Sequence, residues 1–203
     1  MSPCELLDCL CNQQLMSTCT FNRSCGILGM IRKVLLYKSD KISVYCEPAV
    51  DRMSTRRKTT FVRQCIAAEK TLIKDISKKY PKKSKNTHYT FVFKNFKTDQ
   101  TLGNCDQEYD DDIMIELNAK NTASLSRTIA HELVHARQFI SGQLKYNTKI
   151  KYLTYEGDNH RYIYRNQPWE TEAYALQDKG ALKMKRWLLD HVHFNPKLAT
   201  PTL

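Results

Sequence analysis

The sequence lacks any long apolar run and any recognisable export signal. No stretch of about 18 consecutive apolar residues occurs in the 203-residue chain, and a helix needs roughly that length to cross a membrane. The N-terminus has no basic segment, and the polar residues Glu5, Asp8 and Asn12 interrupt its apolar positions, unlike a signal peptide. We therefore expect no membrane partner and a cytoplasmic location.

The sequence also lacks the closely spaced cysteine pairs of a zinc knuckle, although cysteine itself is abundant. Five of the eight cysteines fall within the first 25 residues, and no two are separated by two residues, so no zinc site is expected there. Without an export signal, we expect the thiols to stay reduced. Residues 1–30 show no sustained periodicity, which predicts a Cys-rich, disordered leader, with Met16 or Met30 as an alternative start. One folded domain is expected over residues 31–203.

Acidic residues are the minority among the charged ones. Lys and Arg number 32 against 21 Asp and Glu, which gives a formal net charge of +11. Such an excess attracts polyanions or acidic proteins, so nucleic acid is one expected class of partner. No groove-reading fold or stacking motif accompanies the charge, and solvated basic faces are the alternative interpretation.

Hydrophobic periodicity predicts an α+β domain. Apolar residues recur at helical spacing over residues 54–80, between lysines and arginines, whereas Tyr89, Phe91 and Phe93 alternate with other residues as in a strand. The expected strands are residues 34–37, 42–45, 88–96 and 113–118. Residues 103–112 are acidic and turn-rich but lack the spacing and the glycine of an EF-hand loop. They predict a solvated turn rather than a calcium site.

Residues 124–142 predict a helix that carries a metal-binding pattern, with a serine at its start and Gly142 at its end. His131 and His135 lie one turn apart on the same helix face, the separation at which two imidazole nitrogens can share an ion. Glu132 is rotated by about 100° from His131, so it is poorly placed as a ligand but can reach a metal-bound water. The pattern predicts a zinc site, and a chance pair of histidines is the alternative.

A second helix is expected from Pro168 to about Val192, after a polar, Tyr-rich connection over residues 143–167. Proline is typical of a first helical turn. Glu170 and Glu172 point about 200° apart on such a helix, so only one of them can join the two histidines. A catalytic zinc ion needs three protein ligands and an open position, and one of these carboxylates would complete that set.

The run Pro-Trp-Glu-Thr-Glu-Ala-Tyr at residues 168–174, after His-Glu-Leu-Val-His at residues 131–135, resembles small gluzincin-type zinc peptidases, including short ones encoded by phages and other viruses. The resemblance covers about residues 113–178. It implies a zincin-like α+β fold, in which a small, mostly antiparallel sheet packs on the HExxH helix beside a second, Glu-bearing helix. In these families a small residue, here Ala173, lets the two helices approach closely.

The resemblance also implies an activity and a set of site residues. The chain would be a zinc-dependent metallopeptidase that binds one Zn²⁺ ion through His131, His135 and Glu170. Glu132 would be the catalytic base that activates a zinc-bound water for hydrolysis of a peptide bond. The substrate would be a protein or peptide, and the location would be inside the host cell if the chain is viral.

Several alternatives stay open from the sequence. Glu172 also satisfies Glu-x-x-Ala, and His160 is a third candidate ligand because its surroundings resemble SprT-like proteases, which are associated with removing proteins crosslinked to DNA. His160 or Tyr164 is the expected donor to the oxyanion. The strand at residues 113–118 is the expected edge for an extended substrate. The alternative function is a nucleic-acid-binding adaptor, or a DNA-associated protease of the SprT-like kind.

Overall fold

A computed structural model describes residues 33–98, 101–109, 111–147, 152–156, 167–194 and 196–197. These residues lie within the unit that spans residues 32–203, and the predicted leader, residues 1–30, lies outside the described part. Within those ranges, no helix combines the length and the apolar character needed to cross a bilayer.

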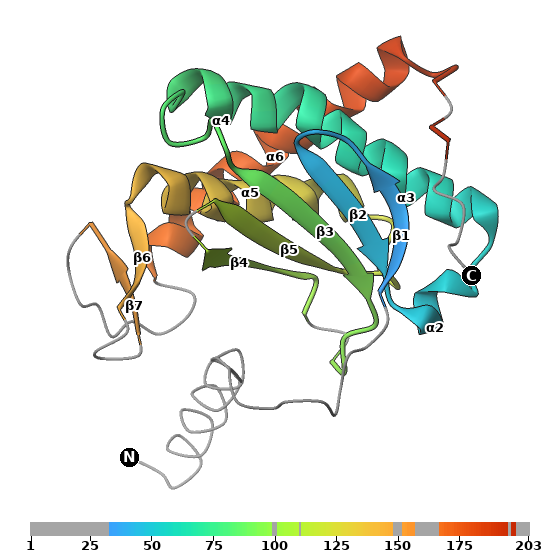
Figure 1. The fold of residues 1–203 in the computed structure, drawn as a ribbon, viewed down its shortest axis with the longest axis horizontal. Coiled ribbons are helices and arrows are strands. Elements are labelled where there is room, and N and C mark those ends of the chain that lie inside the picture. The colour runs from blue at the N-terminus through green and yellow to red at the C-terminus, as the bar shows by residue number, and fades with distance from the viewer. Residues whose placement is uncertain are drawn as a thin grey trace, which may run out of the picture. The chain divides into compact units, whose positions relative to one another are not determined.

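The centre of the fold is a five-stranded sheet in the order β1-β2-β3-β5-β4 (Figure 1). The strands are β1 (Val34–Lys38), β2 (Ile42–Cys46), β3 (His88–Lys94), β4 (Gly103–Tyr109) and β5 (Asp112–Asn118). β1 and β4 run antiparallel to their neighbours, whereas β2, β3 and β5 are parallel to one another. The predicted α+β class is confirmed, but the prediction of a mostly antiparallel sheet is wrong. A long helical crossover joins β2 to β3, and such a crossover makes the two strands parallel.

The acidic segment that was expected to be a turn forms the outer strand β4 instead. Cys105 of β4 pairs with Ile115 of β5, and Ile115 is fully buried. The acidic residues of β4 alternate with Gly103 and Cys105, so one face of the strand can pack on the core while the other stays polar. As a consequence β5 lies between β3 and β4, and the prediction that residues 113–118 form the edge of the sheet is wrong.

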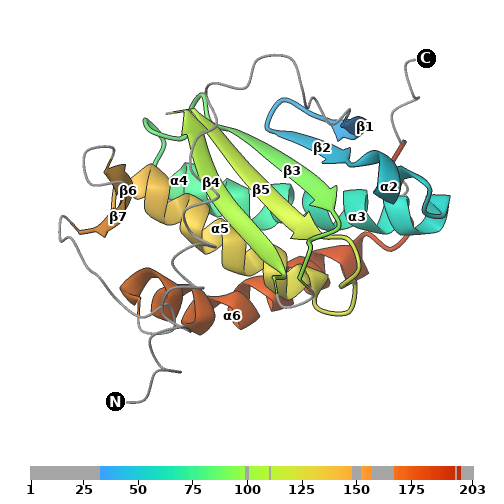
Figure 2. The ribbon, with the colours of Figure 1, turned by 90° about the horizontal axis from the view of Figure 1, so that it is seen from below.

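Helices α3 to α6 gather on one face of the sheet (Figure 2). The helical elements are α2 (Pro48–Asp51), α3 (Thr55–Ala68), the π-helical turn η1 (Glu69–Ile73), α4 (Lys74–Lys79), α5 (Leu125–Ser141) and α6 (Pro168–Asp190). α3, η1 and α4 follow one another without a break, which confirms the helix predicted over residues 54–80. Phe61 of α3 stacks on Phe93 of β3 with ring centres 4.1 Å apart, so α3 closes the core over the sheet.

Helix α5 forms where the apolar spacing predicted it. Ile129, Leu133 and Ala136 recur at helical spacing and are buried in the core. Gly142 ends the helix with φ +84°, and its N–H donates to the carbonyl oxygens of Gln138 and Phe139. Glycine adopts this left-handed conformation without steric cost, so the local sequence fixes where α5 stops.

Helix α6 packs along α5 and begins at Pro168, as predicted. Ala173 is fully buried, and a Cβ atom placed on Gly180 would lie 2.9 Å from the Cβ of Ala130. The two small residues on α6 therefore let the helices approach closely. Between the helices, β6 (Leu144–Asn147) and β7 (Tyr152–Tyr155) pair antiparallel, a hairpin that the sequence did not predict.

Candidate metal centre

The two histidines of α5 point toward the same place. His131 and His135 are one helical turn apart, and their Nε2 atoms lie 3.2 Å from each other. His135 is buried, and the His131 side chain is 12% exposed. The ring of Tyr174 packs edge-on against the ring of His131, with ring centres 4.8 Å apart. The expected pairing of the two imidazoles is therefore present in the folded chain.

The carboxylate of Glu170 completes the cluster from α6. Its Oε2 atom lies 3.3 Å from His131 Nε2, and its Oε1 atom lies 3.3 Å from His135 Nε2. Glu170 is 5% exposed, and it stands in the first turn of α6. The close approach of α6 to α5 is what brings this carboxylate to the histidines.

The donor atoms of these three residues lie close enough together to share a metal ion. Zn²⁺ holds imidazole nitrogen and carboxylate oxygen at about 2.0–2.2 Å in tetrahedral geometry, which places two donors about 3.4 Å apart. The two Nε2 atoms are 3.2 Å apart, and each lies 3.3 Å from a different oxygen of Glu170. One donor atom from each of the three residues lies within 4.8 Å of the other two. Glu170 Oε2 is buried and has no hydrogen-bond partner, a costly condition that a cation would relieve. Among the described residues, His131, His135 and Glu170 form the group that could hold a metal ion.

The chain was compared with protein-family models, with curated proteins and with solved structures. None of these matches it. What the residues themselves show is a buried cluster of two histidines and a glutamate, held between two helices of an α+β domain. The cluster is therefore interpreted from its own geometry.

The electrostatics of the cluster keep Glu170 ionised. Burial alone would raise the pKa of Glu170, but the close contacts of its carboxylate with His131 and His135 outweigh burial and lower the pKa to about 2. Burial lowers the pKa of His135, but its hydrogen bond with Glu170 and the negative charge of Glu132 outweigh burial, so the net shift is upward. A negative carboxylate beside two imidazole nitrogens is a donor set that suits a divalent cation.

Glu132 lies beside the cluster without belonging to it. The side chain is buried, and burial raises the pKa of Glu132 while the nearby histidines only partly offset the rise. A Cβ atom on Gly103, the first residue of β4, would lie 2.6 Å from Glu132 Oε1. The carboxylate therefore lies against the start of the outer strand, where a glycine leaves space for it.

Glu172, the alternative ligand, is directed elsewhere. It accepts a hydrogen bond from Gln138 Nε2 at 2.8 Å and forms an ion pair with Arg137. Burial tends to raise its pKa, but the hydrogen bonds from Arg137 and Gln138 outweigh burial and lower it. The predictions for His160 and Tyr164 lie outside the described residues.

The sequence reasoning overlooked Gln138. Its Oε1 atom lies 2.9 Å from His135 Nδ1, and Gln138 is fully buried. The spacing of the two residues could have identified Gln138, because it follows His135 by three positions and residues three apart on a helix lie on the same face.

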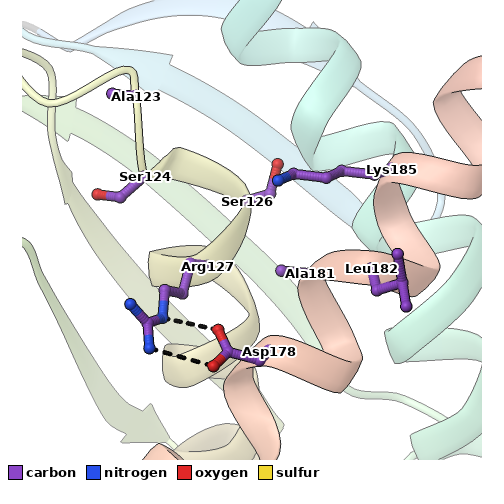
Figure 3. Close-up of a pocket in the computed structure, with 8 residues that line it drawn as sticks. All are labelled: Ala123, Ser124, Ser126, Arg127, Asp178, Ala181, Leu182 and Lys185. Carbon is purple, nitrogen blue, oxygen red and sulfur yellow. Dashed lines mark hydrogen bonds and ion pairs between the residues drawn. The ribbon is translucent and has the colours of Figure 1, made fainter.

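A pocket of about 440 Å³ lies between α5 and α6 beyond the cluster (Figure 3). It is lined by residues that include Ser126, Arg127, Asp178 and Lys185, and no residue of the cluster lines it. Arg127 Nε and Asp178 Oδ1 are 2.8 Å apart, and this ion pair joins the two helices at one end of the pocket in Figure 3. The pocket is therefore separate from the candidate metal centre.

Proposed function

We propose that this protein is a zinc-dependent metallopeptidase in which His131, His135 and Glu170 hold the ion and Glu132 is the general base. The observation that carries the proposal is the convergence of two imidazole nitrogens and one buried carboxylate, with one donor atom from each residue within 4.8 Å of the other two, the donor set of a zinc site. Three protein ligands leave one coordination position open, as catalytic zinc sites do. Glu132, adjacent to His131 and not a ligand, supplies the separate base that peptide hydrolysis needs.

Zinc in such a site supplies Lewis acidity, which polarises a carbonyl and lowers the pKa of a coordinated water to about 7. The chain's own residue for proton transfer is Glu132. Its carboxylate accepts a proton from the attacking water and delivers that proton to the departing amine. Burial raises the pKa of Glu132, which suits a group that must carry a proton between these two steps.

The outer strand β4 supports a peptide as the substrate. β4 hydrogen-bonds to β5 on one side only and ends the sheet in the part of the chain that the structure describes. An extended peptide can add to such an edge through backbone hydrogen bonds. Because Gly103 lies against Glu132, a peptide bound along β4 would pass beside the proposed base. Recognition through the backbone would favour unfolded protein segments and would depend little on their sequence.

The test measures metal content and hydrolysis on the same preparation. We expect about one zinc ion per chain and cleavage of an unstructured protein such as casein. His135→Ala removes a ligand and should abolish both, whereas Glu132→Gln should keep the zinc and lose turnover. A folded chain that takes up no zinc from a zinc-containing buffer would contradict the proposal.

We also propose nucleic-acid binding as a second candidate function, carried by exposed lysines at the end of α4 and in the turn after it. These are Lys78, Lys79, Lys82, Lys83 and Lys85. Binding of this kind releases counterions, so the affinity for DNA should fall steeply as salt rises. A mobility-shift assay with Lys82→Ala/Lys85→Ala should show weaker binding, and Glu132→Gln should leave it unchanged. A chain that forms no complex at low salt contradicts this second function, and a DNA-tethered protease would satisfy both tests.

A further inference from the structure

We propose that Gln138 is a positioning residue that fixes the tautomer and the orientation of His135. The inference rests on the proposed zinc site and deepens it, because it concerns how one ligand is held. Gln138 lies on α5 between His135 and the first turn of α6. It is fully buried, so its amide must find its partners within the protein.

The surroundings of the Gln138 amide fix which way it faces. Its Nε2 atom donates to the carbonyl oxygen of Trp169 at 3.1 Å and to Glu172 Oε2 at 2.8 Å. Both partners are acceptors, so the nitrogen of the amide must face them and the oxygen must face His135. A rotated amide would place its oxygen against two other oxygen atoms.

The orientation of the amide in turn fixes which ring nitrogen of His135 carries the proton. Gln138 Oε1 lies 2.9 Å from His135 Nδ1 and can only accept, so Nδ1 must carry the proton. In the neutral ring the lone pair is then on Nε2, the atom that faces His131 and Glu170. Metal-binding histidines commonly donate their second N–H in this way, and the partner sets both ring orientation and ligand basicity.

The same amide links two proposed ligands that lie on different helices. Trp169, whose carbonyl accepts from Gln138, immediately precedes Glu170 in α6. Glu172 is held in turn by Arg137. Gln138 therefore connects His135 on α5 to the segment of α6 that presents Glu170, and Glu172 acts as an anchor of Gln138 rather than as a ligand.

The experiment compares zinc affinity in the full-length chain and two matched variants. Gln138→Leu removes the acceptor at His135 Nδ1 while keeping a side chain of similar size. Gln177→Leu is the control, because Gln177 is also a buried glutamine at the α5–α6 interface but lies beside Arg127 rather than His135. The zinc dissociation constant is measured by competition with a chelating dye, and the stability of each metal-free variant is measured by urea unfolding.

Loss of an outer partner of a metal-binding histidine typically weakens metal affinity by about 10–100-fold. We expect that loss in Gln138→Leu and an unchanged dissociation constant in Gln177→Leu, even if both variants lose similar stability. Glu172→Gln should weaken zinc binding less than Gln138→Leu, because the carbonyl of Trp169 still orients the amide.

An unchanged zinc affinity in Gln138→Leu, or an equal loss in both leucine variants, would overturn the positioning role. A parent chain that binds zinc but cleaves no peptide would overturn the proposed peptidase activity alone, since zinc affinity still reports on Gln138. A parent chain that binds no zinc would overturn the metal site and the positioning role together.

Discussion

The α5–α6 interface contains two pairs of similar chemistry in opposite surroundings. Toward the start of α6, His131 faces Glu170, and their side chains are 12% and 6% exposed. Further along, Arg127 faces Asp178, and their side chains are 54% and 70% exposed. In both pairs α5 supplies the nitrogen and α6 supplies the carboxylate.

Burial is what separates the two pairs. Water solvates the Arg127–Asp178 pair and screens its attraction, so an exposed pair of this kind contributes little to stability. The buried pair has no such screening, and one oxygen of Glu170 lacks a hydrogen-bond partner. A second histidine converges on the same carboxylate only at the buried pair. A carboxylate beside a nitrogen donor is therefore a candidate metal site where several donor atoms converge in a buried environment.

The largest expected effect separates the two carboxylates of α6. Glu170→Gln keeps the size of the side chain but removes the charge, so zinc content should fall from about one ion per chain to nearly none and activity should be lost. Asp178→Asn makes the same chemical change at the exposed pair and should keep both. Metal analysis and casein hydrolysis check the two variants side by side. Equal zinc content in the two variants would contradict the proposal that Glu170 is a zinc ligand and Asp178 is not.

A second prediction concerns Gly103, which lies against the Glu132 side chain. Gly103→Ala places a Cβ atom 2.6 Å from Glu132 Oε1 and 2.9 Å from Thr128 Cγ2, so the carboxylate must move. Displacement of a catalytic group by about 1 Å can reduce the rate about 100-fold. We expect kcat to fall to that extent while zinc content stays at the parent level. Retention of full activity would show that the contact of Glu132 with Gly103 does not position the base.

The close approach of the two helices gives a third prediction. In Gly180→Ala the added methyl group meets the Cβ of Ala130 at 2.9 Å, and overpacking costs about 1–3 kcal/mol. The gain in helix propensity is about 1 kcal/mol, so the net result should be a lower free energy of unfolding. The double variant Ala130→Gly/Gly180→Ala moves the methyl group across the interface. Urea unfolding should show it less destabilised than the sum of the single variants.

In the metal-free protein, the buried Glu132 carboxylate should lower the free energy of unfolding at neutral pH. Its folded pKa lies above the ordinary value of 4.5, mainly because of burial, so the ionised side chain destabilises the folded state at higher pH. Glu132→Gln should therefore be more stable than the parent chain at pH 7 without metal. The difference should shrink as pH falls toward 4.5 and vanish below it, where the parent side chain is protonated in both states. Urea unfolding in the presence of a chelator between pH 4 and 7 measures the trend.

The smallest effect is expected at the exposed pair itself. Arg127→Ala should change the free energy of unfolding by only about 0–1 kcal/mol, because both partners are well solvated. Most of that change should disappear at high salt, which already screens the pair. A larger loss of stability in thermal or urea unfolding would mean that the Arg127–Asp178 pair contributes more than an exposed ion pair should.

The sequence predicted the helical elements of the site because helical spacing and helix ends are local properties. The i and i+4 spacing of His131 and His135 places both side chains on one face of any helix that they share. The stop at Gly142 and the start at Pro168 follow from the backbone preferences of single residues. No knowledge of distant segments was needed for these predictions.

Contacts between distant segments decided the rest. Whether Glu170 or Glu172 faces the histidines depends on the rotation of α6 against α5, which Ala173 and Gly180 set through close packing. The sequence could not fix the pairing of β2 with β3, because strand order depends on how a crossover packs. The same holds for β4, whose acidic composition conceals a strand that pairs with β5. The spacing of His131 and His135 along the chain is enough to pair them, whereas their carboxylate partner depends on the tertiary structure, because that choice requires two helices to meet.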